Sequence, residues 1–110
     1  MQTAYAQFAD NGNSRTYTGP SHTIAKPDLL IQKRKVPTNI NGVSEMSSKI
    51  VVGSTDASNA PLAQRISIEV VVRVPVGAQT ADVDAAKTRF ADLSSDTAFL
   101  ASFVTQNFVV

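Results

Sequence analysis

Any chemistry in this sequence must come from side chains other than thiols, because cysteine is absent. A thiol nucleophile, a disulfide and a thiolate metal site are therefore excluded. The single histidine, His22, follows Gly-Pro-Ser, and we interpret it as an exposed turn residue rather than a base or a metal ligand. Phosphate-binding glycine loops, nucleophile elbows and metal-ligand spacings are also missing from the sequence. We therefore expect that the protein is not an enzyme and that it binds no cofactor and no metal.

One pair of carboxylates could be considered for acid–base catalysis. Asp82 and Asp84 are two positions apart in a stretch with helical periodicity. Residues with that spacing do not face each other on a helix. We interpret them as acidic residues that favour the positive end of the helix dipole.

The basic residues are unevenly distributed. Residues 1–75 contain eight Lys and Arg against five Asp and Glu, a net charge of +3, and residues 76–110 contain two against four, a net charge of −2. If the basic stretches are neighbouring strands, their cations form a field on one side of a sheet, which suits phosphate contacts. The alternative is a solvated sheet face with ordinary solubility charges. This face carries no aromatic side chains, so we expect no base-stacking platform.

The stretch that must position these cations is residues 64–75. Its even positions from 66 to 74 are all apolar and β-branched, whereas four of its five odd positions from 65 to 73 are polar. Successive side chains of a strand point to opposite faces, so the pattern predicts a strand with one apolar face and one wet, mostly basic face. Burial of the apolar side chains would stabilise the sheet by about 1.5–3 kcal/mol each. These side chains are Ile66, Ile68, Val70, Val72 and Val74.

Four shorter strands are expected before this one. Residues 3–8 and 14–18 flank an Asn-Gly pair, which is a strong hairpin signal. A third strand spans residues 29–36 and stops at Pro37, and a fourth spans residues 45–52 after a second Asn-Gly pair. The facing of the third strand is ambiguous. Either Lys33 and Lys35 share the wet face, or Arg34 does.

After residue 77 the apolar period changes from 2 to 3.6. We expect Thr80 to cap a first helix whose apolar stripe contains Val83, Ala86, Phe90 and Leu93. Residues 94–96 (Ser-Ser-Asp) interrupt this pattern and can cap a second helix. The second helix carries Phe99, Leu100, Phe103 and Val104. The predicted fold is a single α+β domain over residues 1–110. An antiparallel sheet of five to six strands (residues 1–76) precedes two C-terminal helices (residues 80–106).

Two helices of this size cover only part of such a sheet. A monomer would expose a large apolar patch, which soluble monomers usually avoid. We therefore expect a second copy of the chain to supply the missing cover, in a homodimer. The sequence shows no secretory signal and no apolar run of membrane-spanning length. We therefore expect no membrane partner.

The order of these parts resembles the coat protein of single-stranded RNA bacteriophages, the levivirus group. The resemblance rests on residues 29–37, on the Asn41-Gly42 turn into residues 47–53, on residues 64–76 and on the helical residues 82–103. It implies an intertwined dimer whose sheets join edge to edge and whose helices cross onto the partner. It further implies an icosahedral shell, assembled in the cytoplasm of a bacterial host, whose inner sheet face binds the RNA genome. Binding of a genomic RNA hairpin and repression of translation are implied as well.

The resemblance also implies three groups of site residues, with Lys33 and Lys35 preferred over Arg34. The side chains that would face RNA are Lys33, Lys35, Ser47, Lys49, Arg65, Ser67, Glu69 and Arg73. Glu69 would pair with Arg65 or Arg73, or it would cast doubt on the facing of the strand. The loop between dimers would contain Gly53, Ser54, Thr55, Asp56, Ala57, Ser58, Asn59, Ala60 and Pro61. The dimer core would contain Phe90, Leu93, Phe99, Leu100 and Phe103.

A second function stays open beside this one. A small dimeric α+β regulator that binds nucleic acid, without forming a shell, would show the same two-faced sheet and the same helices. Neither hypothesis involves a small-molecule substrate.

Overall fold

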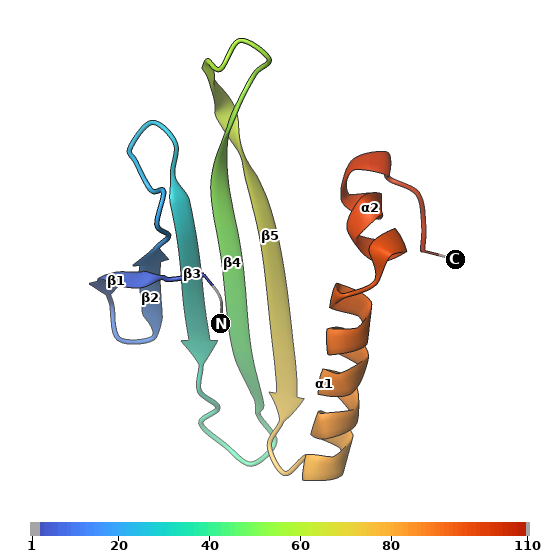
Figure 1. Ribbon diagram of the computed structural model, residues 1–110. Helices are drawn as coiled ribbons and strands as arrows, with labels where there is room; N and C mark the ends of the chain where they lie inside the picture. Colours follow the sequence, from blue (N-terminus) through green and yellow to red (C-terminus); the bar gives the residue numbers. More distant parts are fainter. Residues whose placement is uncertain (1–2, 110) are drawn as a thin grey trace. The chain divides into compact units, whose positions relative to one another are not determined.

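The computed structural model describes residues 3–109 and contains a sheet followed by two helices (Figure 1). The elements are β1 (Ala6–Asp10), β2 (Ser14–Thr18), β3 (Asp28–Lys35), β4 (Val43–Thr55), β5 (Pro61–Pro75), α1 (Thr80–Ser94) and α2 (Thr97–Thr105). The predicted α+β class is confirmed, with five strands in the described residues. These residues form two compact units, a sheet unit that ends at Val76 and a helical unit that begins at Gly77. The single domain expected from the length stays a prediction.

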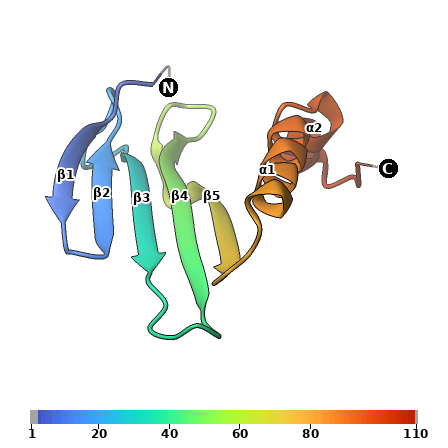
Figure 2. The ribbon, with the colours of Figure 1, turned by 90° about the horizontal axis from the view of Figure 1, so that it is seen from below.

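The sheet is antiparallel throughout and its strands follow one another in chain order, β1-β2-β3-β4-β5 (Figure 2). The predicted Asn-Gly hairpin joins β1 to β2. Gly12 has a φ of 77°, which favours glycine, and its amide donates to the Asp10 carboxylate at 3.0 Å. β1 and β5 form the two edges of the sheet.

The two longest strands extend further than predicted. β4 continues to Thr55 and β5 begins at Pro61, so the connecting loop contains only residues 56–60. Gly53 pairs with Arg65 and Thr55 pairs with Pro61 across an irregularity in the ladder. The prediction of a loop over residues 53–61 was therefore wrong at its margins. Strand β4 includes Gly53, Ser54 and Thr55, and strand β5 includes Pro61. The reason is that backbone pairing continues through a polar sequence that is typical of a turn.

The predicted alternation is confirmed by the strand register. In the β3–β4 and β4–β5 ladders, odd residues pair with odd residues and even residues with even ones. Directly opposite residues share a face, so the odd residues of all three strands lie on one face and the even residues on the other. The apolar positions of residues 64–75 thus share their face with Met46, Ile50 and Val52.

The sheet unit encloses very little apolar material. Val51, at 8% exposure, is the only buried hydrophobic residue among the described residues. Pro27 and Gly53 are buried beside it, where the connection between β2 and β3 packs against β4. A folded chain with so small a core leaves its apolar surfaces open.

The helical unit differs from expectation at its first residue. Thr80 is the first residue of α1 rather than its cap, and Gln79 occupies the N-cap position with extended backbone and no side-chain hydrogen bond. Gly77, with a φ of 86°, makes the turn that brings Gln79 there. The capping of α2 is as predicted, since the Asp96 carboxylate accepts from the amide of Phe99 at 2.9 Å.

The apolar side chains of the helices remain open to solvent. Phe90, Leu93, Leu100 and Phe103 are each 40–49% exposed. Phe99 packs edge-on against Phe103 with ring centroids 5.2 Å apart. No helix within residues 3–109 is long and apolar enough to cross a membrane.

Candidate functional site

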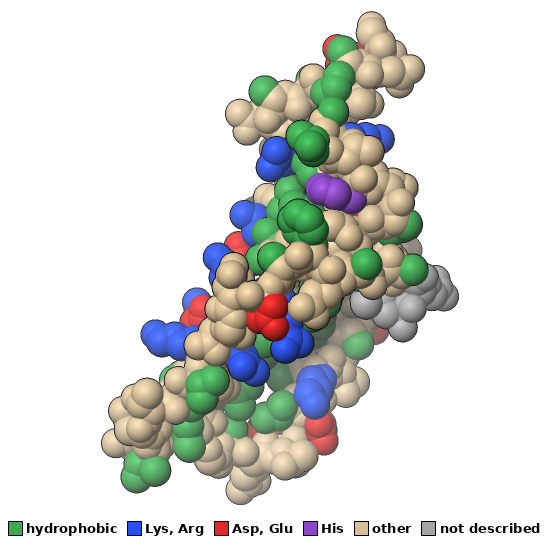
Figure 3. Space-filling view, turned by 90° about the vertical axis from the view of Figure 1, so that its left-hand side faces the viewer, with side chains coloured by type: hydrophobic (Ala, Val, Ile, Leu, Met, Phe, Trp, Pro, Cys, Tyr) green, Lys and Arg blue, Asp and Glu red, His purple; other side chains and the backbone are tan. Residues whose placement is uncertain are grey.

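The odd residues of β3, β4 and β5 form what we call the basic face. All eight side chains predicted to face RNA lie on it, and they come from three adjacent strands. Figure 3 views the molecule from the β1 side of the sheet and shows cationic side chains grouped along one side, with acidic side chains among them. The sheet therefore brings together residues that are up to 40 positions apart in the sequence.

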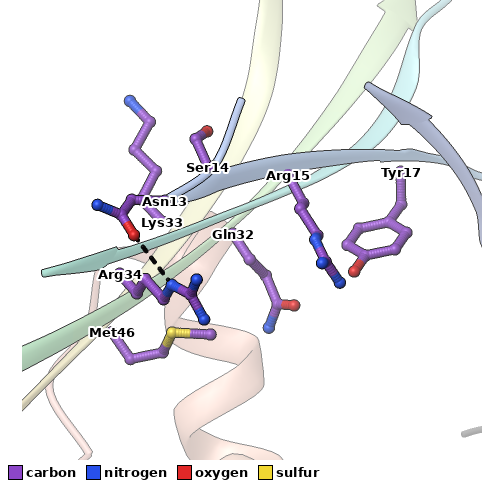
Figure 4. A pocket seen from close by; sticks show the side chains of 9 residues that line it. Asn13, Ser14, Arg15, Tyr17, Gln32, Lys33, Arg34 and Met46 are labelled. Carbon is purple, nitrogen blue, oxygen red and sulfur yellow. Dashed lines mark hydrogen bonds between the residues drawn. The ribbon is translucent and has the colours of Figure 1, made fainter. Parts of the chain in front are cut away.

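The ambiguity of the third strand is resolved by its pairing. Lys33 lies opposite Ser47 and Lys35 lies opposite Glu45, so both lysines belong to the basic face. Arg34 lies on the other face, where its Nε donates to the Asn13 side chain at 3.1 Å. Figure 4 shows the Lys33 and Arg34 side chains leaving β3 in opposite directions.

The carboxylates of the basic face are paired differently from expectation. The Arg73 guanidinium forms an ion pair with Glu45, with Nε and Oε2 3.2 Å apart. Glu69 lies directly opposite Lys49. The expected pairing of Glu69 with Arg65 or Arg73 was wrong, because residues four apart on one strand are separated by about 13 Å.

Cross-strand rows describe the charge of the basic face. From the β3–β4 turn towards the loop between β4 and β5, the rows are Lys35–Glu45–Arg73, Lys33–Ser47–Val71, Ile31–Lys49–Glu69 and Leu29–Val51–Ser67, followed by the pair Gly53–Arg65. The face thus contains five cations and two carboxylates. Three cations share a row with a carboxylate, and Lys33 and Arg65 do not.

Two shallow hollows lie on the basic face. One, of about 400 Å³, is lined by Lys35, Glu45 and Arg73 together with the turn between β3 and β4. The other, of about 430 Å³, has an apolar floor and lies between Lys49 and Arg65. Its floor contains Leu29, Ile31 and Val51. Both hollows combine cations with surface that is open to a ligand.

The even residues of β3, β4 and β5 form what we call the apolar face. On β5, Ile66 is 56% exposed and Val72 is 50% exposed, although both are β-branched aliphatic residues. Met46, Ile50 and Ile68 on the same face are also exposed. So much exposed apolar surface on one side of a sheet is typical of an interface.

A small polar hollow of about 150 Å³ interrupts the apolar face near β2. Figure 4 shows Arg15, Tyr17 and Gln32 pointing into it from β2 and β3. The pKa of the Arg15 guanidinium is raised, first by its hydrogen bond with Tyr17 and then by Asp10, whose carboxylate lies 3.2 Å away. No motif in the sequence predicts this group. The alternation of Arg15 with Tyr17 was its only signal.

The loop of residues 56–60 is held by one carboxylate. Asp56 Oδ1 accepts from the amides of Ser58 at 2.8 Å and Ala60 at 3.0 Å. The backbone amide of Asp56 donates to the Ala60 carbonyl at 2.9 Å, and Asn59 adopts a left-handed φ of 63°. The tip between β4 and β5 is therefore an ordered turn.

Side chains suited to catalysis are not brought together. Within residues 3–109, no group of three or more His, Asp and Glu residues could hold a metal ion. Asp84 forms an ion pair with Lys87 at 3.6 Å, away from Asp82. His22 is half-buried rather than exposed as predicted, because its Nδ1 accepts from the amide of Asp28 at 3.1 Å and its ring lies near Phe8.

One charged residue of the basic face was not included among the predicted site residues. Glu45 shares the basic face with Ser47 and Lys49, and it neutralises part of the charge of that face. Its alternation with Ser47 and Lys49 in the sequence was the signal that could have identified it.

Neither a protein-family model nor a curated protein sequence matches this chain. Solved structures do match it. A virus-like particle chain of Wenzhou levi-like virus 4 aligns with a TM-score of 0.85 at 17% identity, over 100% of this chain and 81% of that one. A virus-like particle chain of Beihai levi-like virus 21 aligns with a TM-score of 0.80 at 9% identity, over 98% and 88%. The coat protein of bacteriophage EMS014 aligns with a TM-score of 0.73 at 14% identity, over 94% and 86%.

These alignments span nearly the whole chain and establish its fold. The chain has the fold of RNA-phage coat proteins, as the resemblance in sequence pattern predicted. These three structures are of virus-like particles and a coat protein.

Proposed function

We propose that this chain is the coat protein of a levi-like RNA phage, which dimerises, assembles into an icosahedral shell and binds genomic RNA on its basic face. One observation supports this most strongly. A chain with the coat-protein fold buries a single hydrophobic residue among those described, Val51, and exposes a whole apolar sheet face. Such a chain needs further copies of itself to complete its core.

Dimer formation accounts for the open apolar surfaces. The apolar face of the sheet and the apolar stripes of α1 and α2 are complementary in character, and both are exposed in one chain. Burial of each large aliphatic side chain would contribute about 1.5–3 kcal/mol. We infer that the helices of each subunit cover the apolar face of its partner. Phe90, Leu93, Phe99, Leu100 and Phe103 would then form the dimer core.

The long edge strand supports the same arrangement. β5 contains 15 residues and forms one edge of the sheet. A long edge with β-branched side chains is a template for pairing with another chain, and natural proteins usually protect such an edge. We infer that β5 of one subunit pairs with β5 of its partner and joins the two sheets.

RNA binding accounts for the basic face. Five cations and two carboxylates give this face a net charge of +3 in each chain, and therefore +6 in each dimer. Phosphate groups would neutralise these cations and release counterions, a mode of binding that depends little on base sequence. The same face would hold a genomic RNA hairpin, through which the dimer would repress translation.

Contacts between dimers are assigned to the tip of the β4–β5 hairpin. Residues 56–60 form an ordered turn at the end of the two longest strands, stabilised by Asp56. An ordered tip can make a defined contact without a large loss of conformational entropy. We infer that these tips meet around the axes of the shell, in virions that assemble in the cytoplasm of the bacterial host.

Expression of the chain alone in a bacterial host tests the proposal. We expect the lysate to yield large particles on a sizing column, regular shells by electron microscopy and RNA protected from nuclease. A small dimer without particles or RNA would contradict the coat-protein function. A small dimer that binds an RNA hairpin but forms no shell would support the regulator instead.

A further inference from the structure

We propose that Glu45 restrains RNA binding on the basic face, because it holds Arg73 and must be displaced before a phosphate group can bind between Arg73 and Lys35. This inference rests on the proposed function. It assigns to a carboxylate on the RNA-binding surface the role of setting how strongly that surface binds.

The first observation is the geometry of one cross-strand row. Lys35 on β3, Glu45 on β4 and Arg73 on β5 lie directly opposite one another on the same face. Glu45 Oε2 lies 3.2 Å from Arg73 Nε, and the Glu45 side chain lies between the two cations. The carboxylate contacts Arg73, and Lys35 lies in the same row on the neighbouring strand, so an anion bound at this row would have a cation on each side of Glu45.

The second observation is the hollow at the same place. Lys35, Glu45 and Arg73 line a depression of about 400 Å³ with residues of the turn between β3 and β4. The Arg73 side chain is 64% exposed and the Glu45 side chain is 38% exposed. A phosphate group can therefore reach the Arg73–Glu45 ion pair from solvent. The cations are accessible, and their partner is the only carboxylate that lines this hollow.

The exchange is physically reasonable because the existing ion pair is exposed. Ion pairs between exposed side chains are weak and are screened by salt. A phosphate group can instead accept two parallel hydrogen bonds from a guanidinium, and it can attract Lys35 at the same time. Binding is therefore possible, but it is weakened by the loss of the Arg73–Glu45 pair.

The pattern extends over the face. Glu69 lies directly opposite Lys49 in the β4–β5 register, whereas Lys33 lies opposite Ser47 and Arg65 lies opposite Gly53. Lys33 and Arg65 thus share no row with a carboxylate, Arg73 is held in an ion pair, and Lys35 and Lys49 each lie in a row with a carboxylate. A single dimer would then bind RNA weakly, and many dimers that contact one RNA would bind it firmly through multivalency.

Salt-dependent binding measurements test this inference. Fluorescence anisotropy would follow binding of a labelled 20-nucleotide poly-U RNA to unassembled full-length protein at several salt concentrations. We expect Glu45→Gln to bind roughly fivefold more tightly at low salt. Because each new phosphate contact on a single strand adds about 0.7 to the slope of log affinity against log salt, the slope should steepen by about 0.7 to 1.4.

Asp10→Asn provides a matched control. The Asp10–Arg15 pair has the same 3.2 Å distance and similar exposure, and Arg15 points into the polar hollow of the apolar face. Its removal changes the net charge by the same amount, so we expect no gain in RNA binding. An equal gain in both variants would show a general charge effect and would overturn the inference.

A double-mutant cycle with Arg73→Gln locates the effect. When Arg73 is replaced as well, the gain in RNA affinity from Glu45→Gln should fall to the part that comes from the Lys35 contact alone. A gain in affinity that persists in full would contradict the inference. Glu69→Gln should steepen the slope independently, through Lys49. If wild-type protein binds RNA and Glu45→Gln binds identically, the inference fails and the coat-protein function stands. If neither protein binds RNA, both fail.

Discussion

The backbone amide of Gly53 donates a hydrogen bond of 2.7 Å to the carbonyl oxygen of Pro27. This contact fastens the connection between β2 and β3 against β4, next to the buried Val51. A Cβ atom at residue 53 would lie 2.7 Å from Pro27 Cδ and 2.9 Å from Lys26 Cα. Glycine is therefore required in β4 by close packing, not by backbone conformation.

The first prediction follows from this packing. Gly53→Ala should lower the free energy of unfolding by about 1–3 kcal/mol, because the added methyl group has to displace backbone atoms. Urea unfolding followed by circular dichroism measures the change. Ser58→Ala, in the exposed turn, is the control and should stay within about 0.5 kcal/mol of the wild type. Equal stability of Gly53→Ala and the wild type would show that the connection moves aside freely.

A second prediction concerns the apolar face. Ile68→Lys should abolish the dimer and the particles, because a buried ammonium group would lack a partner in the interface. The neighbouring Ser67→Lys places the same side chain on the basic face and should leave the dimer intact. A sizing column distinguishes the two. A monomer from Ser67→Lys and a dimer from Ile68→Lys would reverse the assignment of the faces.

A third prediction concerns the cations that share no row with a carboxylate. The double variant Lys33→Ala, Arg65→Ala should package less RNA, and its salt slope should fall by about 1.4, or about 0.7 for each lost phosphate contact. The dimer should persist, since both side chains lie on the basic face. Arg34→Ala, on the apolar face, should keep the slope unchanged. Ultraviolet absorbance of purified particles measures the packaged RNA.

A fourth prediction concerns the tip of the β4–β5 hairpin. Asp56→Ala removes the acceptor of the Ser58 and Ala60 amides and should loosen the turn. We expect dimers to form while the yield of regular shells falls, as counted by electron microscopy. Asp56→Asn keeps an oxygen at that position and should restore assembly. If Asp56→Ala forms normal shells, the proposed role of the hairpin tip in contacts between dimers is contradicted.

The local pattern of the sequence was sufficient for the elements and for their two faces. Alternation along residues 64–75 predicted the amphipathic strand, the Asn-Gly pair predicted the first hairpin, and the change of period near Gly77 predicted the helices. These features depend on residues close to one another in the chain. For that reason they could be predicted without the structure, apart from the exact ends of β1, β4 and β5 and the first residue of α1.

Cross-strand pairing, in contrast, was decided only by the tertiary structure. The sequence alone left Lys33 and Lys35 in competition with Arg34, and it assigned Glu69 to the wrong partner. Register depends on backbone pairing between distant segments, and a shift of one residue would turn every side chain to the other face. The alternation determined that a basic face exists. Only the ladder placed Glu45 against Arg73 and Glu69 opposite Lys49 on it.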